Sequence, residues 1–175
     1  MKTLLFISFI LIQTISLSFQ APSPPPVICD GKYFIVNKAN CDVLEIEKGS
    51  KECGANVIVS CKNGLDSEKF IIKNVDSKYV TIVNEKSCLA LTIETKKDGA
   101  FLEQTPIIKG CPNAFQLFKI IKDCDDYYLI QNKACGLFIN GNSCASTPCC
   151  NRAAIQTAKC PSDIENFLFK FLPVC

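Results

Sequence analysis

Cysteine is the residue type through which this chain could do most chemistry, because the sequence holds 13 cysteines and no histidine. Cysteine and histidine together make the common zinc sites and the thiol nucleophiles that a base activates. The absence of histidine removes the commonest general base and every Ser–His or Cys–His pair. No two cysteines have the Cys-x-x-Cys spacing of a zinc site either. The cysteines therefore predict disulfide bonds, provided that the chain reaches an oxidising compartment.

The first residues predict that it does. Lys2 precedes an apolar run from Leu4 to about Leu17, and the small residues Ser16 and Ser18 follow at a spacing suited to cleavage. This is the pattern of a secretory signal peptide. An uncleaved anchor is the less favoured alternative, because a transmembrane helix needs about 20 apolar residues. We expect a signal peptide over residues 1–20, a Pro-rich spacer over 21–28, and one domain over 29–175 that is secreted to the extracellular space without a membrane span.

Carboxylates are the remaining candidates for chemistry. The stretches "CDD" at 124–126 and "DSE" at 66–68 bring acidic side chains together, as a glycosidase requires. Acidic residues between strand-like segments are more typical of solvated turns. The net charge of +2, with lysines interspersed among acidic residues, provides no basic surface for nucleic acid. We predict a protein that is not an enzyme and that takes no cofactor and no metal.

A threefold repeat must position whatever site the chain has. The similar segments "YFIVN", "VTIVN" and "YLIQN" end at Asn37, Asn84 and Asn132, which are 47 and 48 residues apart. A fixed period of this kind indicates equivalent structural units, here about 32–76, 79–123 and 127–172. Each unit contains four segments rich in Val, Ile, Phe and Tyr between turn residues, with no sustained helical period. Twelve short strands favour an all-β fold that closes into a barrel, because closure leaves no exposed sheet edge.

These repeats resemble the β-trefoil of ricin-B-type lectins over residues 32–172. That family closes each repeat on Gln-x-Trp, and the corresponding triplets here are "EKF" at 68–70, "QLF" at 116–118 and "FLF" at 167–169. The motifs are degraded, since the chain has no tryptophan. The resemblance implies a disulfide-rich β-trefoil of three four-stranded repeats. It also implies that Phe70, Phe118 and Phe169 form a core layer in place of the tryptophans.

The resemblance also implies disulfide pairings. In the family, a cysteine after the first strand of a repeat bonds to one before the closing motif. The matching pairs are Cys41–Cys61, Cys88–Cys111 and Cys135–Cys160, and the adjacent ends of a trefoil add Cys29–Cys175. Among the others, Cys144 could pair with Cys149 or Cys150, and Cys53 with Cys124. The odd count leaves one cysteine over, so the vicinal pair serves either two bridges or an intermolecular crosslink.

The galactose-type sites of the family are eroded in this chain. Each working repeat of the family has an aspartate two residues after the first cysteine, an aromatic residue two before the second, and Asn-Gln at the closing motif. Val43, Ala90 and Leu137 stand at the aspartate position, and Val59, Lys109 and Ala158 stand at the aromatic position. The polar residues that remain as binding candidates are Asp42, Asn63, Glu68, Gln116 and Gln156.

We therefore expect a secreted carbohydrate-binding protein of ricin-B type whose partner is a glycan or glycoprotein. Two alternatives remain open. One is a structural component of an extracellular coat, wall or tube, crosslinked by disulfides through the odd cysteine. The other is a trefoil module that binds proteins or inhibits proteases through the loop "NSCASTPCC".

Overall fold

The computed structural model describes residues 27–107, 110–123, 125–141, 152–153, 155–157 and 164–174. The described part of the chain is all-β, with short 3-10 turns, as expected. Repeat 1 has strands β1 (Gly31–Asn37), β2 (Val43–Ile46), β3 (Val57–Ser60) and β4 (Lys69–Asn74). Repeat 2 has β5 (Val80–Asn84), β6 (Ala90–Ile93), β7 (Leu102–Thr105) and β8 (Phe118–Lys122). Repeat 3 has β9 (Tyr128–Asn132), β10 (Phe138–Asn140), β12 (Ile155–Thr157) and β13 (Leu168–Pro173).

Each repeat thus contributes four strands, as predicted from its sequence. A further short strand, β11 (Arg152–Ala153), pairs with β3 of repeat 1. The 3-10 turns are η1 (Glu47–Gly49), η2 (Asp66–Glu68), η4 (Ala114–Gln116) and η5 (Ile164–Phe167). Three of them, η2, η4 and η5, immediately precede the closing strand of a repeat. No helix in the described ranges is long and apolar enough to cross a membrane.

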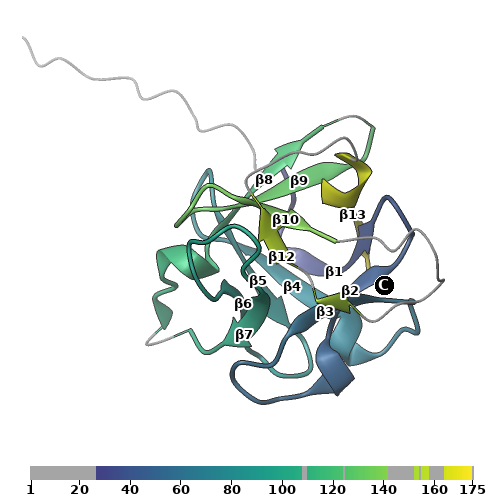
Figure 1. Ribbon diagram of the computed structural model, residues 1–175, viewed down its shortest axis with the longest axis horizontal. Coiled ribbons are helices and arrows are strands. Elements are labelled where there is room, and N and C mark those ends of the chain that lie inside the picture. Colours follow the sequence, from purple (N-terminus) through teal and green to yellow (C-terminus); the bar gives the residue numbers. More distant parts are fainter. Residues whose placement is uncertain are drawn as a thin grey trace, which may run out of the picture.

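The first and last strands of the three repeats close into a barrel. Going round it, β1 pairs with β4, β4 with β5, β5 with β8, β8 with β9, β9 with β13, and β13 with β1 again. The two middle strands of each repeat form the hairpins β2–β3, β6–β7 and β10–β12, which join the barrel through β1, β5 and β9. Figure 1 shows these hairpins around the barrel, with β6 and β7 at the lower left.

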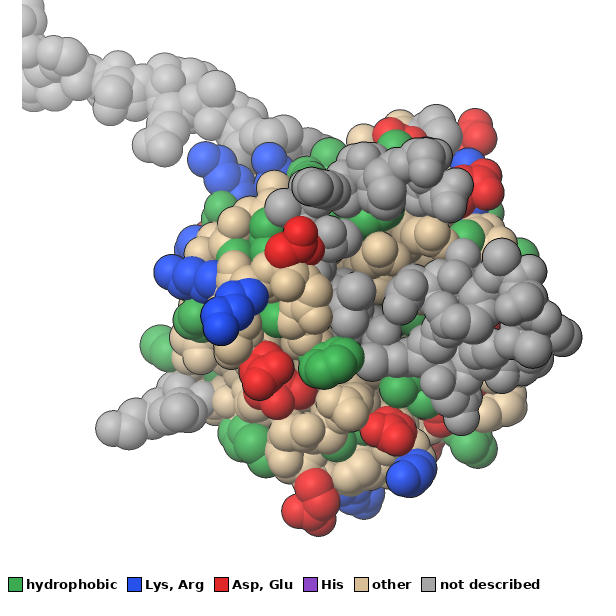
Figure 2. All heavy atoms as spheres, viewed as in Figure 1, with side chains coloured by type: hydrophobic (Ala, Val, Ile, Leu, Met, Phe, Trp, Pro, Cys, Tyr) green, Lys and Arg blue, Asp and Glu red, His purple; other side chains and the backbone are tan. Residues whose placement is uncertain are grey.

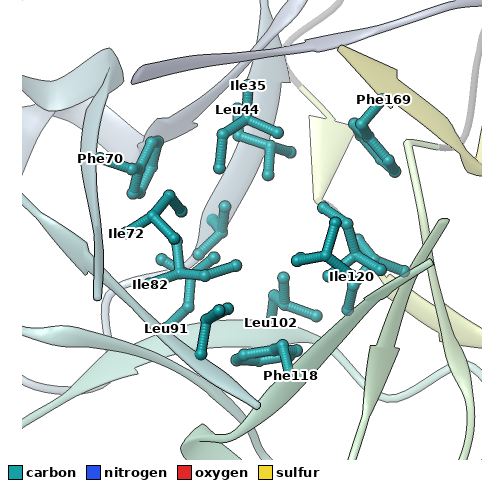
Figure 3. Packing of buried hydrophobic residues seen from close by; sticks show 14 of the residues in the cluster. Ile35, Leu44, Phe70, Ile72, Ile82, Leu91, Leu102, Phe118, Ile120 and Phe169 are labelled. Atoms are coloured by element: carbon teal, nitrogen blue, oxygen red, sulfur yellow. The ribbon is translucent and has the colours of Figure 1, made fainter. Parts of the chain in front are cut away.

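The core lies inside this barrel and under the hairpins. Phe70, Phe118 and Phe169 are completely buried in one cluster of aliphatic and aromatic side chains. In Figure 3 they stand at three corners of the cluster, with Ile72, Ile82, Ile120 and other aliphatic side chains between them. The prediction that these three phenylalanines share a core layer is confirmed.

The repeated asparagines hold neighbouring repeats together. Asn84 is fully buried, and its Nδ2 donates to the carbonyl oxygens of Ser67 (2.9 Å) and Lys69 (3.2 Å), which belong to repeat 1. Its Oδ1 accepts from the backbone N–H groups of Lys86 (3.1 Å) and Ser87 (3.2 Å) in the turn that follows. Each such side chain therefore ties its own turn to the closing segment of the preceding repeat.

The other two asparagines repeat this arrangement. Asn37 donates to the carbonyl of Asn166 at 2.9 Å, and Asn132 donates to that of Phe115 at 2.9 Å. The Oδ1 of Asn37 accepts from the N–H of Ala39, and that of Asn132 from the N–H of Ala134. This shared role accounts for the recurrence of asparagine at the end of the first strand.

Three of the expected disulfides are not formed in the structure. Cys41 has a free thiol whereas Cys61 is disulfide-bonded, Cys88 and Cys111 both have free thiols, and so does Cys29, whose expected partner Cys175 lies outside the described residues. The register gives the reason in repeat 1. Val43 pairs with Ser60, so Cys61 follows opposite Asp42, and Cys41 sits one residue further in an exposed turn with φ 62°.

In repeat 2 the two cysteines are separated along the hairpin. Ala90 pairs with Thr105, so Cys111 lies well past the end of β7 while Cys88 lies in the turn before β6. In repeat 3, Cys160 is outside the described residues, and Cys135 Sγ lies 3.6 Å from Asn132 Oδ1. The Cys135–Cys160 pairing stays a prediction.

Candidate functional site

A polar depression lies on the outer face of the β2–β3 hairpin. Strand alternation turns Leu44 and Ile46 into the core, and therefore turns Glu45 outward. The ladder places Ile58 opposite Glu45, and Ser60 opposite Val43, on this same outer face. The depression has a volume of about 310 Å³. Its lining includes Glu45, Glu47, Lys48, Ile58, Ser60 and Asn63.

Two serine hydroxyls hold the Glu45 carboxylate in place. Ser60 Oγ donates to Oε2 at 2.5 Å, and Ser67 Oγ donates to Oε1 at 3.0 Å. Both serines are almost fully buried, at 4% and 1% exposure. A carboxylate oriented by two hydrogen bonds is ready to accept further hydrogen bonds from a ligand with little loss of rotamer entropy.

A second carboxylate and one ammonium stand at the edge of the depression. Glu47 Oε2 accepts from Asn56 Nδ2 at 3.1 Å. Lys48 Nζ is 3.8 Å from Glu47 Oε1, and its side chain is 89% exposed. This is an exposed ion pair, so Lys48 can move away from Glu47 at little cost.

Two of the predicted site residues, Asn63 and Glu68, come together beneath this face. Glu68 is fully buried, and its carboxylate accepts from the backbone N–H groups of Asn63 (2.8 Å) and Gly64 (2.7 Å). Gly64 has φ 84°, a conformation that glycine adopts without a steric penalty. Glu68 therefore shapes the turn that carries Asn63 into the depression, and Glu68 itself does not line it.

Gln116, the equivalent of Glu68 in repeat 2, is also buried. Its Nε2 donates to Thr105 Oγ1 at 2.9 Å and to the carbonyl oxygen of Pro106 at 3.0 Å. Thr92, which occupies the position of Glu45 in this repeat, bonds to Thr105 Oγ1 at 2.6 Å. In repeat 2 these polar groups bond to one another, whereas in repeat 1 a carboxylate faces outward.

The described lining of the depression includes neither of the remaining two predicted residues. Asp42 is nearly buried at the start of the hairpin, and desolvation raises the pKa of its carboxyl above the ordinary value. It is not among the residues that line the depression. Gln156 lies in β12 at the position that pairs with Ile139, and its side chain is outside the described residues.

Sequence reasoning missed Glu45, Ser60 and Ser67 as a group. Glu45 is two residues after Val43, which stands at the family's aspartate position, so the two share one face of β2. That period was the available signal for Glu45. The contact with Ser67, 22 residues further along the chain, depends on how η2 packs against β2.

Other surfaces of the described part offer less specific chemistry. A second depression of about 360 Å³ is lined by Lys73, Val75, Ile107 and Pro112 among others, and it is largely aliphatic. On the face shown in Figure 2, acidic and basic side chains are interspersed. Among the described residues, no group of three or more His, Cys, Asp or Glu side chains could hold a metal ion.

Comparison with known proteins agrees with this geometry. Residues 26–107 match the family model described as ricin-type beta-trefoil lectin domain-like. A designed threefold symmetric protein, ThreeFoil, superposes with a TM-score of 0.74 at 22% identity, covering 83% of this chain and all of that one. The Rhizoctonia solani agglutinin superposes with a TM-score of 0.71 at 16% identity, covering 86% of this chain and all of that one.

An exo-beta-1,3-galactanase from Clostridium thermocellum superposes with a TM-score of 0.71 at 26% identity. The match covers 86% of this chain but only 31% of the galactanase. No curated protein sequence matches the chain.

Proposed function

We propose that this chain is a divergent ricin-B-type β-trefoil domain, and that it is a secreted, non-enzymatic carbohydrate-binding protein whose site is the depression on the β2–β3 hairpin. One observation carries the proposal: Glu45 faces outward on this hairpin and is held by Ser60 and Ser67. Vicinal hydroxyls of a sugar can donate to such a carboxylate.

The place of the depression in the fold supports this proposal. Val43, at the family's aspartate position, neighbours Glu45 on the outer face, and Ser67 stands at the family's closing asparagine position. An acidic side chain thus stands two residues further along the same strand face than the family's aspartate position. Since Val43 and Val59 are buried aliphatic residues, we expect simple galactosides to bind weakly or not at all.

Non-enzymatic binding is the simpler function for this site. Glu45 has both oxygens bonded to serines, and the second carboxylate of the described lining, Glu47, stands at the exposed edge, where it accepts from Asn56 and lies near Lys48. The galactanase named above is three times longer than its match to this chain, so its activity is not carried over. The alternatives that depend on the loop at 142–150 concern residues outside the described ranges.

The test is glycan binding by the oxidised, secreted chain, first on a broad glycan array and then by calorimetry. We expect Glu45→Ala to weaken binding of the selected glycans at least about tenfold, which corresponds to about 1.4 kcal/mol. Glu94→Ala is the matched control, because Glu94 is an exposed glutamate at the position of Glu47 in repeat 2. A chain that binds no glycan, or whose binding survives Glu45→Ala, would refute the proposal.

A further inference from the structure

The charges and hydrogen-bond acceptors of the depression on the β2–β3 hairpin also restrict the class of sugar that it can bind. Resting on the proposed function, we infer that it selects an amino sugar, a 2-amino-2-deoxyhexose with a free ammonium group, and that it rejects sulfated, uronic and sialic acid sugars. The inference depends on where the hydroxyl protons point and on which charges line the depression.

The hydroxyl protons are already used inside the protein. A serine hydroxyl has one proton and two lone pairs. Ser60 and Ser67 both give that proton to Glu45. What Glu45 and Ser60 present to the depression is therefore a set of acceptors. A ligand that donates hydrogen bonds satisfies them, whereas a ligand oxygen without a proton leaves them unpaired.

The turn around Asn63 adds one more acceptor whose capacity is partly used. Asn63 Oδ1 accepts from the N–H of Leu65 at 2.9 Å, which fixes the orientation of the amide. Among the side chains of the described lining, the donors left are the amide Nδ2 of Asn63 and the ammonium of Lys48. Acceptors therefore outnumber donors in the depression.

The charges of the lining favour a cation. Glu45 and Glu47 contribute two carboxylates, and Lys48 contributes one ammonium that points mainly into solvent. Two further lysines lie nearby without lining the depression. Lys62 Nζ is 4.2 Å from the centre of the Phe34 ring, and Lys86 lies beside Gly49. An anionic sugar would bring its charge against two carboxylates, and an ammonium sugar would neutralise the excess.

The N-acetyl hexosamine is the sugar that differs least from the proposed amino sugar. Acetylation replaces the ammonium with an amide, which removes the charge and adds a carbonyl acceptor. That carbonyl would face the carboxylates and the Ser60 oxygen of the depression. We therefore expect the free amine to bind better than its acetylated counterpart.

Calorimetry of the intact, oxidised chain tests this with three probes: an oligomer of glucosamine, the same oligomer fully N-acetylated, and the same oligomer N-sulfated. At about pH 6, where a sugar amine is protonated, we expect the glucosamine oligomer to bind about tenfold more tightly than the acetylated one. The sulfated oligomer should show no binding. Raising the salt concentration should reduce the preference for the amine, since part of it is screened charge attraction.

Two variants distinguish an effect of charge on binding from an effect of unfolding. Glu45→Gln keeps a side chain of the same size next to Ser60 and Ser67, and Glu47→Gln changes only the exposed edge. Each should lower the preference for the amine by several-fold, and Glu94→Gln should leave it unchanged. Thermal unfolding of each variant checks that the domain remains folded.

The outcomes are distinguishable. Binding of neutral or sulfated oligomers as tight as that of the amine, with loss of binding in Glu45→Ala, would overturn this inference and leave the carbohydrate-binding function intact. An unchanged preference in both Gln variants would overturn it as well. A chain that binds no glycan of any kind would overturn both.

Discussion

At the scale of single residues, buried polar side chains in this protein serve structure more than binding. Asn84 makes hydrogen bonds in both directions, to carbonyls of the preceding repeat and from N–H groups of its own turn. Glu68 and Gln116 likewise make their hydrogen bonds to neighbouring backbone and hydroxyl groups. Glu45 differs from them because it remains open to solvent on one side of its two serine contacts.

Replacement of Asn84 by alanine tests the role of the repeated asparagines. The substitution leaves buried N–H and C=O groups without partners, and each unpaired group costs about 1–3 kcal/mol. We expect the free energy of unfolding to fall by about 2–4 kcal/mol, measured by denaturant titration. Asn56→Ala is the control, since Asn56 is exposed and its side chain donates to Glu47 on the surface. An equal effect of the two substitutions would contradict the assigned role.

Asp42 provides a test in the pH dependence of stability. Burial raises the pKa of its carboxyl in the folded state above the ordinary value of 3.8. A raised folded pKa means that the protonated carboxyl stabilises the fold at low pH, and that this stability is lost as the pH rises through the folded pKa. We expect Asp42→Asn to raise the Tm at about pH 7 and to have no such effect at about pH 3.

Asp76 is the comparison with the opposite sign. The backbone N–H groups of Lys78 and Tyr79 donate to Asp76 Oδ1 at 2.7 and 2.8 Å and lower the pKa of its carboxyl. Its ionised form therefore stabilises the fold above the ordinary pKa, and the stability is lost as the pH falls through the lowered pKa. Asp76→Asn should not raise the Tm near neutral pH. A fall in Tm for Asp42→Asn at neutral pH would contradict the first expectation.

At the scale of the elements, a pair of side chains at equivalent positions links each repeat to its neighbour. Lys133 Nζ lies 4.4 Å from the centre of the Tyr79 ring, and Lys38 Nζ lies 5.1 Å from that of Tyr127. At the equivalent place between repeats 1 and 2, Glu85 forms an ion pair with Lys32. The same junction is therefore made twice by a cation over a ring and once by an ion pair with the charges exchanged.

The salt dependence of these junctions should differ. A double-mutant cycle on Lys32 and Glu85 should give a coupling of about 0.5–1 kcal/mol that decreases at high salt. A cycle on Lys133 and Tyr79 should give a similar coupling, about 0.5–1 kcal/mol, that changes less with salt. The measurement is the free energy of unfolding of the single and double alanine variants at low and high salt. Equal salt dependence of the two cycles would contradict this account.

The single variants at the ionic junction are also informative. Glu85 Oε2 is buried without a hydrogen-bond partner in the described part of the structure. Removing the ammonium of Lys32 leaves that carboxylate without its ion-pair partner, whereas removing Glu85 frees a lysine whose side chain is already 40% exposed. We therefore expect Lys32→Ala to be the more destabilising of the two.

At the scale of the whole molecule, the barrel depends on one phenylalanine from each repeat. Phe70, Phe118 and Phe169 occupy equivalent ladder positions, opposite Tyr33, Val80 and Tyr128, the residues at or near the start of each first strand. A loss in one repeat therefore weakens the packing of all three, because the three side chains share one core.

Phe118→Ala tests this shared core. Truncation of a buried phenylalanine typically costs about 3–5 kcal/mol, and we expect a cost in that range here. Phe101→Ala is the control, because Phe101 is 49% exposed and its truncation should cost about 1 kcal/mol or less. Denaturant unfolding monitored by two spectroscopic probes would also show whether all three repeats lose stability together. A Phe118→Ala domain as stable as the wild type would contradict the shared-core account.

The sequence by itself determined the periodic features of this protein. The spacing of Asn37, Asn84 and Asn132 predicted three equivalent units, and the apolar segments predicted four strands in each. The resemblance of these repeats to ricin-B-type lectins implied that Phe70, Phe118 and Phe169 are buried together. The repeats and their strands recur at a fixed period along the chain and depend on local strand and turn preferences. They can therefore be predicted without knowing which strands pair.

Only the tertiary structure decided the composition of the candidate site and the fate of the cysteines. An offset of one residue in a strand turns a side chain to the opposite face. The β2–β3 register therefore decides that Ser60 shares the outer face with Glu45, and it places Cys61 opposite Asp42, one residue away from Cys41. The contact between Glu45 and Ser67 requires η2 to fold back onto β2, and Glu68 is drawn under the Asn63 turn by the same packing. Pairing between distant segments of the chain sets these contacts, and no local sequence pattern predicts that pairing.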